Sequence, residues 1–242
     1  MEFGSNVIMD TGESSSEIIR VEGVKKVYQD NGVPVEALRG INLAVSSGDF
    51  SVIAGPSGSG KTTLLNIIGT LDKPTEGRVF LDSEDIGSKS RRELADIRLR
   101  KIGFVFQAYN LNPVLSALEN VEFTMMLRGI DPRERKRRSL ALLEQLGIAE
   151  LARKRPNEMS GGQQQRVAVA RAISNEPRLV LADEPTANLD SETAVKLLEL
   201  MENLNREDGI TFVFSSHDPQ VIERAHRLLI LKDGRIAGDK RN

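Results

Sequence analysis

The segment Gly55-Pro56-Ser57-Gly58-Ser59-Gly60-Lys61-Thr62 constrains this chain more than any other, because it fits the pattern G-x-x-x-x-G-K-[ST]. An apolar run over residues 50–54 leads into it, and a helical run over residues 62–68 follows it. Glycines let backbone N–H groups converge on an anion without Cβ clashes, and a helix N-terminus adds the positive end of its dipole. The segment therefore predicts a phosphate-binding loop, with a glycine-rich turn that opens a helix as the alternative.

Two side chains at the end of this loop suit the phosphates of a nucleotide and its metal ion. The Lys61 ammonium would reach the β- and γ-phosphate oxygens. The Thr62 hydroxyl could ligate Mg²⁺, an ion that prefers oxygen ligands and keeps part of its water shell. We therefore expect the loop to bind a nucleotide together with Mg²⁺.

A pair of acidic residues, Asp183 and Glu184, follows the apolar run at residues 179–182. The carboxyl ends of parallel strands are where ligands bind, so the pair should lie near the phosphate loop. Asp183 could hold Mg²⁺ directly or through water, and Glu184 could accept a proton from a water that attacks the γ-phosphate. The alternative is that both acids cap the following helix or complement its dipole.

The spacing of apolar residues predicts a change of architecture along the chain. Short β-branched runs dominate the first part, amphipathic segments follow, and the last third alternates strands with helices, which indicates βαβ units and a parallel sheet. The expected strands are residues 18–27, 41–45, 50–54, 79–81, 102–106, 179–182 and 210–215. The expected helices are residues 62–68, 91–100, 116–128, 132–146, 161–174, 191–205 and 219–225.

Composition excludes several classes of protein. The 242 residues contain no cysteine, which removes disulfide scaffolds, cysteine nucleophiles and thiolate metal sites. The net charge of −2 argues against a nucleic-acid-binding protein, although residues 88–160 hold 15 Lys+Arg against 9 Asp+Glu. No apolar stretch approaches the ~18 residues that cross a bilayer.

Residues 1–16 are expected to be a disordered tail, partly derived from an expression vector.

Ser160-Gly161-Gly162-Gln163 opens the helix expected at residues 161–174. Its Ser-x-x-Gln spacing is a capping box, which explains the serine and the glutamine by local structure alone. The two glycines are harder to explain in that way, because each lowers helix propensity by about 1 kcal/mol. Bare backbone at a helix N-terminus suits close approach by an anion.

From about residue 18 onwards the chain resembles the ATP-binding-cassette (ABC) ATPases. Several of its segments match that family's motifs in the expected order. They are Tyr28 (the aromatic that stacks on adenine), Gly55 to Thr63 (the phosphate loop), Gln107 (the glutamine that joins the metal site to the helical subdomain), Met159 to Gln163 (the signature motif), Leu179 to Glu184 (the acidic strand), Ala187 to Asp190 (the loop that touches the opposite subunit) and His217 (the switch histidine). Met159 and Thr62 stand where Leu and Ser are commoner, and neither change removes the required chemistry.

The resemblance implies an α/β fold: a P-loop NTPase core with a mostly parallel sheet, an N-terminal antiparallel β subdomain and an inserted α-helical subdomain at about residues 88–160. These parts would form one ATPase domain over residues 17–242. The segments 65–75 and 102–107 look most like the lipoprotein-release and macrolide-export branch.

The resemblance also implies a function: two copies sandwich two MgATP, hydrolyse them and drive transmembrane permease subunits from the cytoplasmic face of the inner membrane. The residues implied are Glu184, His217 and Gln107 for catalysis; Tyr28, Gly55, Pro56, Ser57, Gly58, Ser59, Gly60, Lys61, Thr62 and Thr63 for ATP; Thr62, Gln107 and Asp183 for Mg²⁺; and Ser160, Gly161, Gly162, Gln163 and Asp190 for the ATP of the opposite subunit.

Other interpretations of single residues stay open at this point. Tyr28 could cover the edge of the core, Gln107 could end an edge strand, and His217 could be an ordinary loop residue. The basic run at residues 133–138 is either a solvated helix face or a surface that docks on anionic lipid or a partner protein.

Two other functions compete with the transporter subunit. One is a soluble cassette ATPase that acts on nucleic acid or ribosomes, for which the chain lacks a paired cassette or a long coiled-coil insertion. The other is a small-molecule kinase, which leaves residues 160–163 unexplained.

Overall fold

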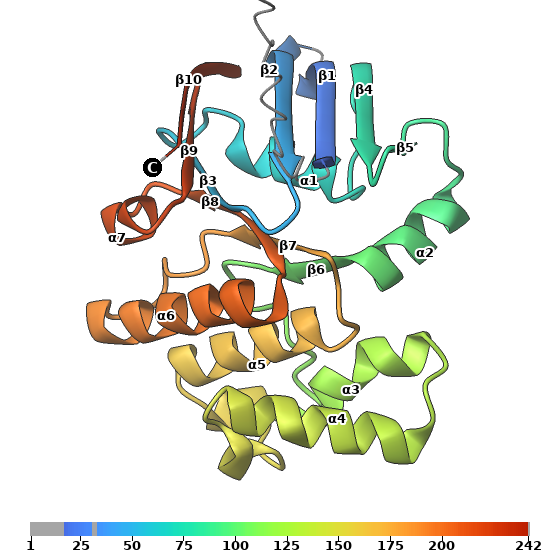
Figure 1. Cartoon of the computed structure of the whole chain (residues 1–242), viewed down its shortest axis with the longest axis vertical. Helices are drawn as coiled ribbons and strands as arrows, with labels where there is room; N and C mark the ends of the chain where they lie inside the picture. The colour runs from blue at the N-terminus through green and yellow to red at the C-terminus, as the bar shows by residue number, and fades with distance from the viewer. Residues whose placement is uncertain (1–16, 31–32, 242) are drawn as a thin grey trace, which may run out of the picture.

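The structure is a computed structural model, and it describes residues 17–30 and 33–241. The predicted tail at residues 1–16 lies outside the described residues. The chain has the predicted α/β architecture, with two sheets and helices on both faces of the larger one (Figure 1).

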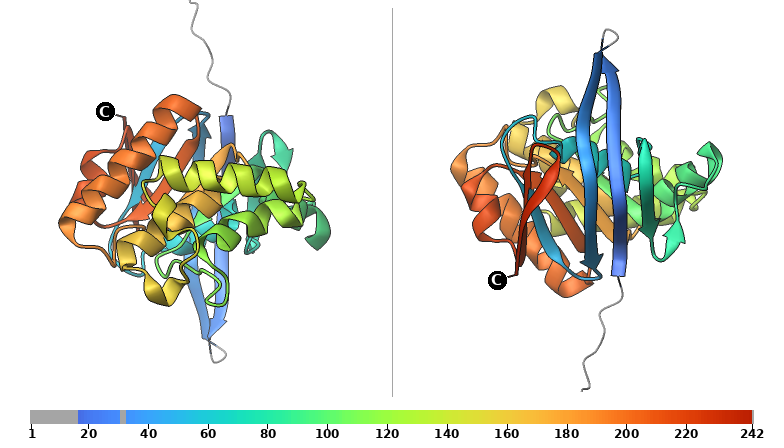
Figure 2. Two further views of the ribbon diagram at one scale, coloured as in Figure 1. Left: turned by 90° about the horizontal axis from the view of Figure 1, so that it is seen from below. Right: turned by 90° about the horizontal axis from the view of Figure 1, so that it is seen from above.

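An antiparallel sheet forms the upper layer in Figure 1, as predicted for the N-terminal part of the chain. Its strands, in spatial order, are β2 (Val33–Ser46), β1 (Glu17–Asp30), β4 (Glu76–Leu81) and β5 (Glu84–Asp85). β1 and β2 make a long hairpin that extends past the rest of the molecule (Figure 2).

The second sheet is the mostly parallel one. Its strands, in spatial order, are β10 (Arg235–Arg241), β9 (Arg227–Lys232), β3 (Phe50–Ala54), β8 (Thr211–Ser216), β7 (Leu179–Asp183) and β6 (Ile102–Val105). Every pairing is parallel except that of β9 with β10. The carboxyl ends of β3, β7 and β8 therefore lie at one edge of the sheet, as the sequence predicted.

The helices lie between the two sheets and below the parallel sheet, where α3, α4 and α5 gather at the end of the molecule away from the antiparallel sheet (Figures 1 and 2). They are α1 (Lys61–Ile68), α2 (Arg91–Lys101), α3 (Ala117–Leu127), α4 (Pro132–Gln145), α5 (Gly161–Ile173), α6 (Ser191–Asp208) and α7 (Pro219–Glu223), with short 3-10 turns η1 (Ala149–Leu151) and η2 (Pro156–Glu158). The division into a core and an inserted subdomain at about residues 88–160 stays a prediction.

Local sequence explains where three of these helices begin. Ser90, Ser116 and Ser160 each accept a hydrogen bond from the backbone N–H three residues on, and a Glu or Gln side chain at that position returns the bond. This reciprocal pairing satisfies donors that a helix N-terminus otherwise leaves free.

Two apolar cores pack on opposite faces of the parallel sheet. One core fills the space around α1 between the two sheets, with residues such as Ile53, Leu64 and Val213. The other lies under the sheet and includes Phe212, Leu197 and Val167 from β8, α6 and α5. Alternate residues of a strand point to opposite faces, so each central strand serves both cores.

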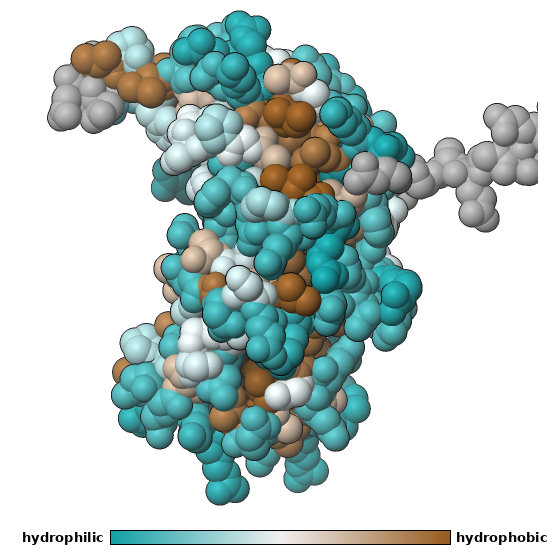
Figure 3. All heavy atoms as spheres, turned by 90° about the vertical axis from the view of Figure 1, so that its left-hand side faces the viewer, coloured by the Kyte–Doolittle hydropathy of each residue, from teal (hydrophilic) through white to brown (hydrophobic). Residues whose placement is uncertain are grey.

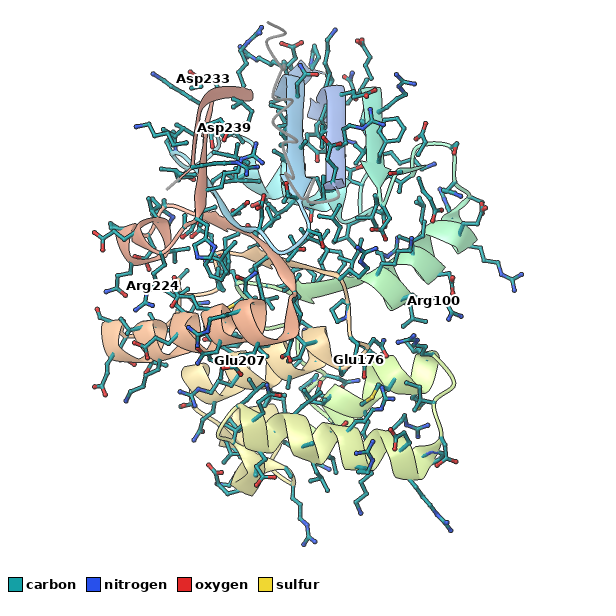
Figure 4. The ribbon with its side chains drawn as sticks, viewed as in Figure 1. Arg100, Glu176, Glu207, Arg224, Asp233 and Asp239 are labelled. Atoms are coloured by element: carbon teal, nitrogen blue, oxygen red, sulfur yellow. The ribbon has the colours of Figure 1, made fainter. Side chains whose placement is uncertain are left out.

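The structure adds three strands that the sequence pattern did not predict: the two-residue β5, and the pair β9 and β10. The apolar run inside β9 is short, and β10 is an edge strand of mostly polar residues whose pairing with β9 is shifted near Gly238. Arg227 holds this hairpin in place: its guanidinium donates to Asp239 at 2.9 and 2.6 Å and to the carbonyl of Ala44 on β2. Figure 4 labels Asp239 on β10.

Within the described ranges, no helix is long and apolar enough to cross a membrane. On the face in Figure 3, apolar residues appear as separate patches among hydrophilic ones.

We predict that Phe212→Ala lowers the free energy of unfolding by about 3–5 kcal/mol, because the ring is fully buried and packs against Phe50 and Phe214. Phe123→Ala is the matched control, since that ring is 41% exposed on α3. Urea unfolding measures both, and equal losses would contradict this assignment of the core.

Candidate functional site

The phosphate-loop segment forms the predicted turn between β3 and α1. Gly58 and Gly60 have φ of 78° and 104°, values that favour glycine. A Cβ on Gly60 would lie 2.6 Å from the carbonyl of Ala37, so a larger residue does not fit there. The Lys61 ammonium lies inside the loop and donates to the carbonyl of Gly55 at 2.8 Å.

One polar atom of the loop is buried without a partner. Ser59 is 3% exposed, and its Oγ makes no hydrogen bond, although its carbonyl accepts one from Gly234 N–H at 3.1 Å. This hydroxyl is enclosed by the protein, so the donors that the loop offers an anion are its backbone N–H groups and the Lys61 ammonium. The loop thus fits a phosphate group by backbone shape and by donor chemistry.

Thr62 and Asp183, two of the three predicted Mg²⁺ ligands, come from distant segments and meet in the structure. The Thr62 hydroxyl donates to Asp183 Oδ1 at 3.1 Å. Hydroxyl and carboxylate oxygens suit Mg²⁺, which commonly takes one or two protein ligands and completes its shell with phosphate and water. Residues 17–30 and 33–241 contain no cluster of three or more His, Asp or Glu that could hold a metal, so a protein-only metal cage is absent from this part of the chain.

Glu184 has an unusual backbone conformation that directs its carboxylate. Its φ is 46°, in the left-handed region, and its N–H donates to the carbonyl of Ser215 at 2.9 Å. One carboxylate oxygen lies 2.8 Å from His217 Nδ1, and the other accepts a hydrogen bond from Ser216 Oγ at 3.1 Å. A non-glycine residue in this region costs about 1–3 kcal/mol, and such strain is typical of functional sites.

A cavity of about 370 Å³ brings most of these groups together. It is lined by Ala37, Ser57, Gly58, Gly60, Lys61, Thr62, Thr63, Gln107, Glu184 and His217. Gly55, Pro56, Ser59 and Asp183 adjoin it through the loop and the contacts given above. Tyr28 lies on β1 outside this lining, and its hydroxyl donates to Asp72 at 2.7 Å.

The signature residues Ser160, Gly161, Gly162 and Gln163 do not line this cavity. They form the first turn of α5, where Ser160 is exposed. A Cβ on Gly161 would lie 2.7 Å from Tyr109 Oη, and one on Gly162 would collide with Thr193 Cγ2. Close packing against Thr193 is therefore a reason for Gly162 that the sequence did not reveal, whereas the Tyr109 side chain could move away from a Cβ on Gly161.

The loop that contains Asp190 and the helix α5 both contact the backbone at or just after Gln107. Asn188 Nδ2 donates to the Gln107 carbonyl at 2.9 Å, and Asp190 caps α6 by accepting from Thr193 N–H at 3.0 Å. Arg171 of α5 donates to the carbonyls of Tyr109 and Asn110, just after Gln107. Burial lowers the pKa of the Arg171 guanidinium.

Sequence reasoning missed several side chains that hold the site together. Ser216 touches the carboxylate of Glu184, and Arg171 anchors the backbone after Gln107. The polar run from Ser215 to Asp218, which begins in the last two residues of the buried strand β8, was a signal for Ser216. No local pattern marks Arg171, because its partners lie about sixty residues away in sequence.

Residues 38–187 match the family model described as ABC transporter. The chain is 48% identical over 225 residues to an uncharacterized ABC transporter ATP-binding protein of Thermotoga maritima, covering 93% of this chain and 96% of the relative. The chain belongs to the ABC transporter family. It is also 46% identical to LolD, the lipoprotein-releasing system ATP-binding protein of Aquifex aeolicus, over 93% of this chain and 98% of that protein. The predicted resemblance is thereby confirmed, including its branch.

A solved structure agrees with this family assignment. The dimeric post-hydrolysis state of the ATP-binding cassette MJ0796, from Methanocaldococcus jannaschii, bound to ADP and Pi, is 44% identical and superposes with a TM-score of 0.87. The match covers 92% of this ABC chain and 98% of that one.

We predict that Gly162→Ala lowers the free energy of unfolding of this ABC domain by about 1–3 kcal/mol, because the added methyl collides with Thr193 Cγ2. Thr193→Ser removes that methyl and keeps the hydroxyl that donates to Asp190. The double variant should therefore recover most of the loss in urea unfolding. A double variant no more stable than Gly162→Ala alone would contradict the packing reason.

Proposed function

We propose that this chain is the ATP-hydrolysing subunit of a membrane transporter of the export or lipoprotein-release type. One observation carries the proposal most: Glu184 is held by His217 and Ser216 at the cavity that the phosphate loop lines. A carboxylate fixed in that place suits activation of a water beside the terminal phosphate.

The phosphate loop would bind the triphosphate of ATP. Backbone N–H groups of residues 57–62 and the Lys61 ammonium would compensate its negative charge. Thr62, Asp183 and Gln107 would hold Mg²⁺, which when bound would neutralise charge on the phosphate oxygens. Tyr28 would stack on the adenine.

Glu184 would act as the general base. One carboxylate oxygen would accept the proton of a water as that water attacks the γ-phosphorus, and the bond to the ADP oxygen would break. Ser216 and His217 would keep the carboxylate in place, and the exposed imidazole of His217 would also contact the γ-phosphate.

The ATP site would be completed by a second copy of the chain. Ser160, Gly161, Gly162, Gln163 and Asp190 lie outside the cavity of their own chain and would face the γ-phosphate bound by the other. Helix α5 begins at the exposed Ser160, and a helix N-terminus of this kind suits an anion. The dimeric MJ0796 structures support a homodimer.

The partners would be transmembrane permease subunits, with this chain at the cytoplasmic face of the inner membrane. Two relatives bear the name of a transport system: LolD, and the macrolide export ATP-binding/permease protein MacB of Syntrophobacter fumaroxidans, which is 45% identical over 91% of this chain and 31% of MacB. A cassette acting on nucleic acid or ribosomes is the alternative. Nucleic-acid binding that weakens steeply with salt would favour that alternative.

We predict that Glu184→Gln still binds MgATP but lowers turnover by about 10²–10⁴-fold, because the amide cannot accept the proton. Phosphate release measures turnover, and light scattering should show accumulation of a nucleotide-bound dimer. Glu176→Gln is the control, since Glu176 pairs with Arg138 away from the cavity (labelled in Figure 4). Unchanged turnover in Glu184→Gln would remove Glu184 as the base.

We predict that Ser160→Arg leaves ATP binding by the monomer nearly intact and lowers hydrolysis by about 10²-fold or more, because the bulky cation blocks the opposite subunit's site. Ser90→Arg is the matched control: Ser90 caps α2 with the same reciprocal bonds but lies in another helix. Equal turnover in the two variants would contradict an ATP site shared between subunits.

A further inference from the structure

Two side chains of β1, Lys26 and Tyr28, converge on one carboxylate that lies just after the phosphate-loop helix α1. Asp72 lies after α1 and accepts hydrogen bonds from Lys26 Nζ at 2.7 Å and from Tyr28 Oη at 2.7 Å. Its Oδ1 also accepts from the N–H of Lys73 at 2.7 Å, and Lys26 Nζ reaches the Lys73 carbonyl at 2.8 Å. Both carboxylate oxygens and the ammonium are therefore engaged.

The same lysine covers one side of the tyrosine ring. Lys26 Nζ lies 4.8 Å from the ring centroid of Tyr28, within cation–π range. The Lys26 side chain is 13% exposed, whereas Tyr28 is 39% exposed. A planar ligand can therefore stack only on the ring face opposite the ammonium.

Asp72 itself is fixed to α1. The N–H groups of Leu71 and Asp72 donate to the carbonyl of Asn66 at 2.8 and 3.2 Å. Thr63, in the first turn of that helix, is close enough to the Tyr28 hydroxyl to act on its pKa, which it lowers. The helix that begins at the phosphate loop thus also sets the position of the tyrosine.

We propose that Asp72 and Lys26 are positioning residues that hold the Tyr28 ring as a platform for the base of the bound nucleotide. The proposal rests on the proposed function, in which Tyr28 stacks on adenine. The Tyr28 hydroxyl donates its proton to Asp72, so it is not available to the edge of the nucleotide base. Tyr28 therefore offers that base only the face of its ring. Stacking of this kind accepts any base.

The ionisation of these groups provides a spectroscopic readout. Burial and the hydrogen bond to Asp72 raise the pKa of the Tyr28 hydroxyl. For Asp72, burial acts to raise the pKa of the carboxyl, but the bonds from Lys26 and Tyr28 outweigh it and lower that pKa. The chain has two tyrosines and no tryptophan, so Tyr109→Phe leaves Tyr28 as the single source of tyrosinate absorbance.

The test compares the full chain with Asp72→Asn, Lys26→Met and Tyr28→Leu. Glu76→Gln is the matched control, because it breaks the 2.7 Å ion pair between Glu76 of β4 and Lys25 of β1, the strand that carries Tyr28. Calorimetry measures the affinity for MgATP and for inorganic tripolyphosphate, which has no base. We expect Asp72→Asn and Lys26→Met to lower the affinity for MgATP by about three- to thirtyfold. The affinity for tripolyphosphate should stay unchanged.

Two further results are expected if Asp72 acts through Tyr28. The double variant Asp72→Asn/Tyr28→Leu should bind ATP no more weakly than Tyr28→Leu alone. In the Tyr109→Phe background, Asp72→Asn should lower the midpoint of the Tyr28 titration.

Three results would overturn the proposal: Asp72→Asn binding ATP as Glu76→Gln does, an equal loss of tripolyphosphate affinity, or additive losses in the double variant. Failure of the proposed function would give a different result. If the phosphate loop does not bind ATP, Lys61→Ala should bind ATP as tightly as the original chain does.

Discussion

The parallel pairing of β3 with β8 and of β8 with β7 is the constraint on which the site depends. In this register Ala54 lies beside Ser216 and Asp183 beside Ser215, so three strands end at one edge of the sheet. The next residues along each strand begin the phosphate loop, the turn at Glu184 and the turn at His217. These turns are short and start from buried strands. Their side chains are therefore held within hydrogen-bond distance of one another without a long supporting loop.

Much of this arrangement could be predicted from sequence, because its elements carry local signals. The glycine-lysine loop, the capping boxes at Ser90, Ser116 and Ser160, and the buried run before Asp183 each have a pattern that local physics explains. The hairpin of β9 and β10 could not be predicted in this way. β10 is mostly polar, and its position depends on the contacts that Arg227 makes with Asp239 and with β2, which join residues far apart in the chain.

The candidate site shows the same division between local and long-range causes. The residue types suited to phosphate and Mg²⁺ were evident from spacing, and the structure places Thr62 against Asp183 and Glu184 against His217. The supporting contacts were not evident, because Ser216, Arg171 and Asp72 act through partners that only the fold brings near. Gly162 is instructive: the sequence favoured a ligand as the reason for a bare backbone, and the structure adds a methyl of Thr193 that leaves no room for a side chain.

Covalent cross-linking tests the central claim, that two copies complete each ATP site. The chain has no cysteine, and Ser57 and Ser160 are both exposed, so cysteines introduced there are the sole thiols. Chains carrying Ser57→Cys are mixed with chains carrying Ser160→Cys and treated with a short bifunctional maleimide. The account predicts a covalent heterodimer that forms with MgATP and not without it. A mixture that stays monomeric in MgATP, or cross-links equally without nucleotide, would contradict it.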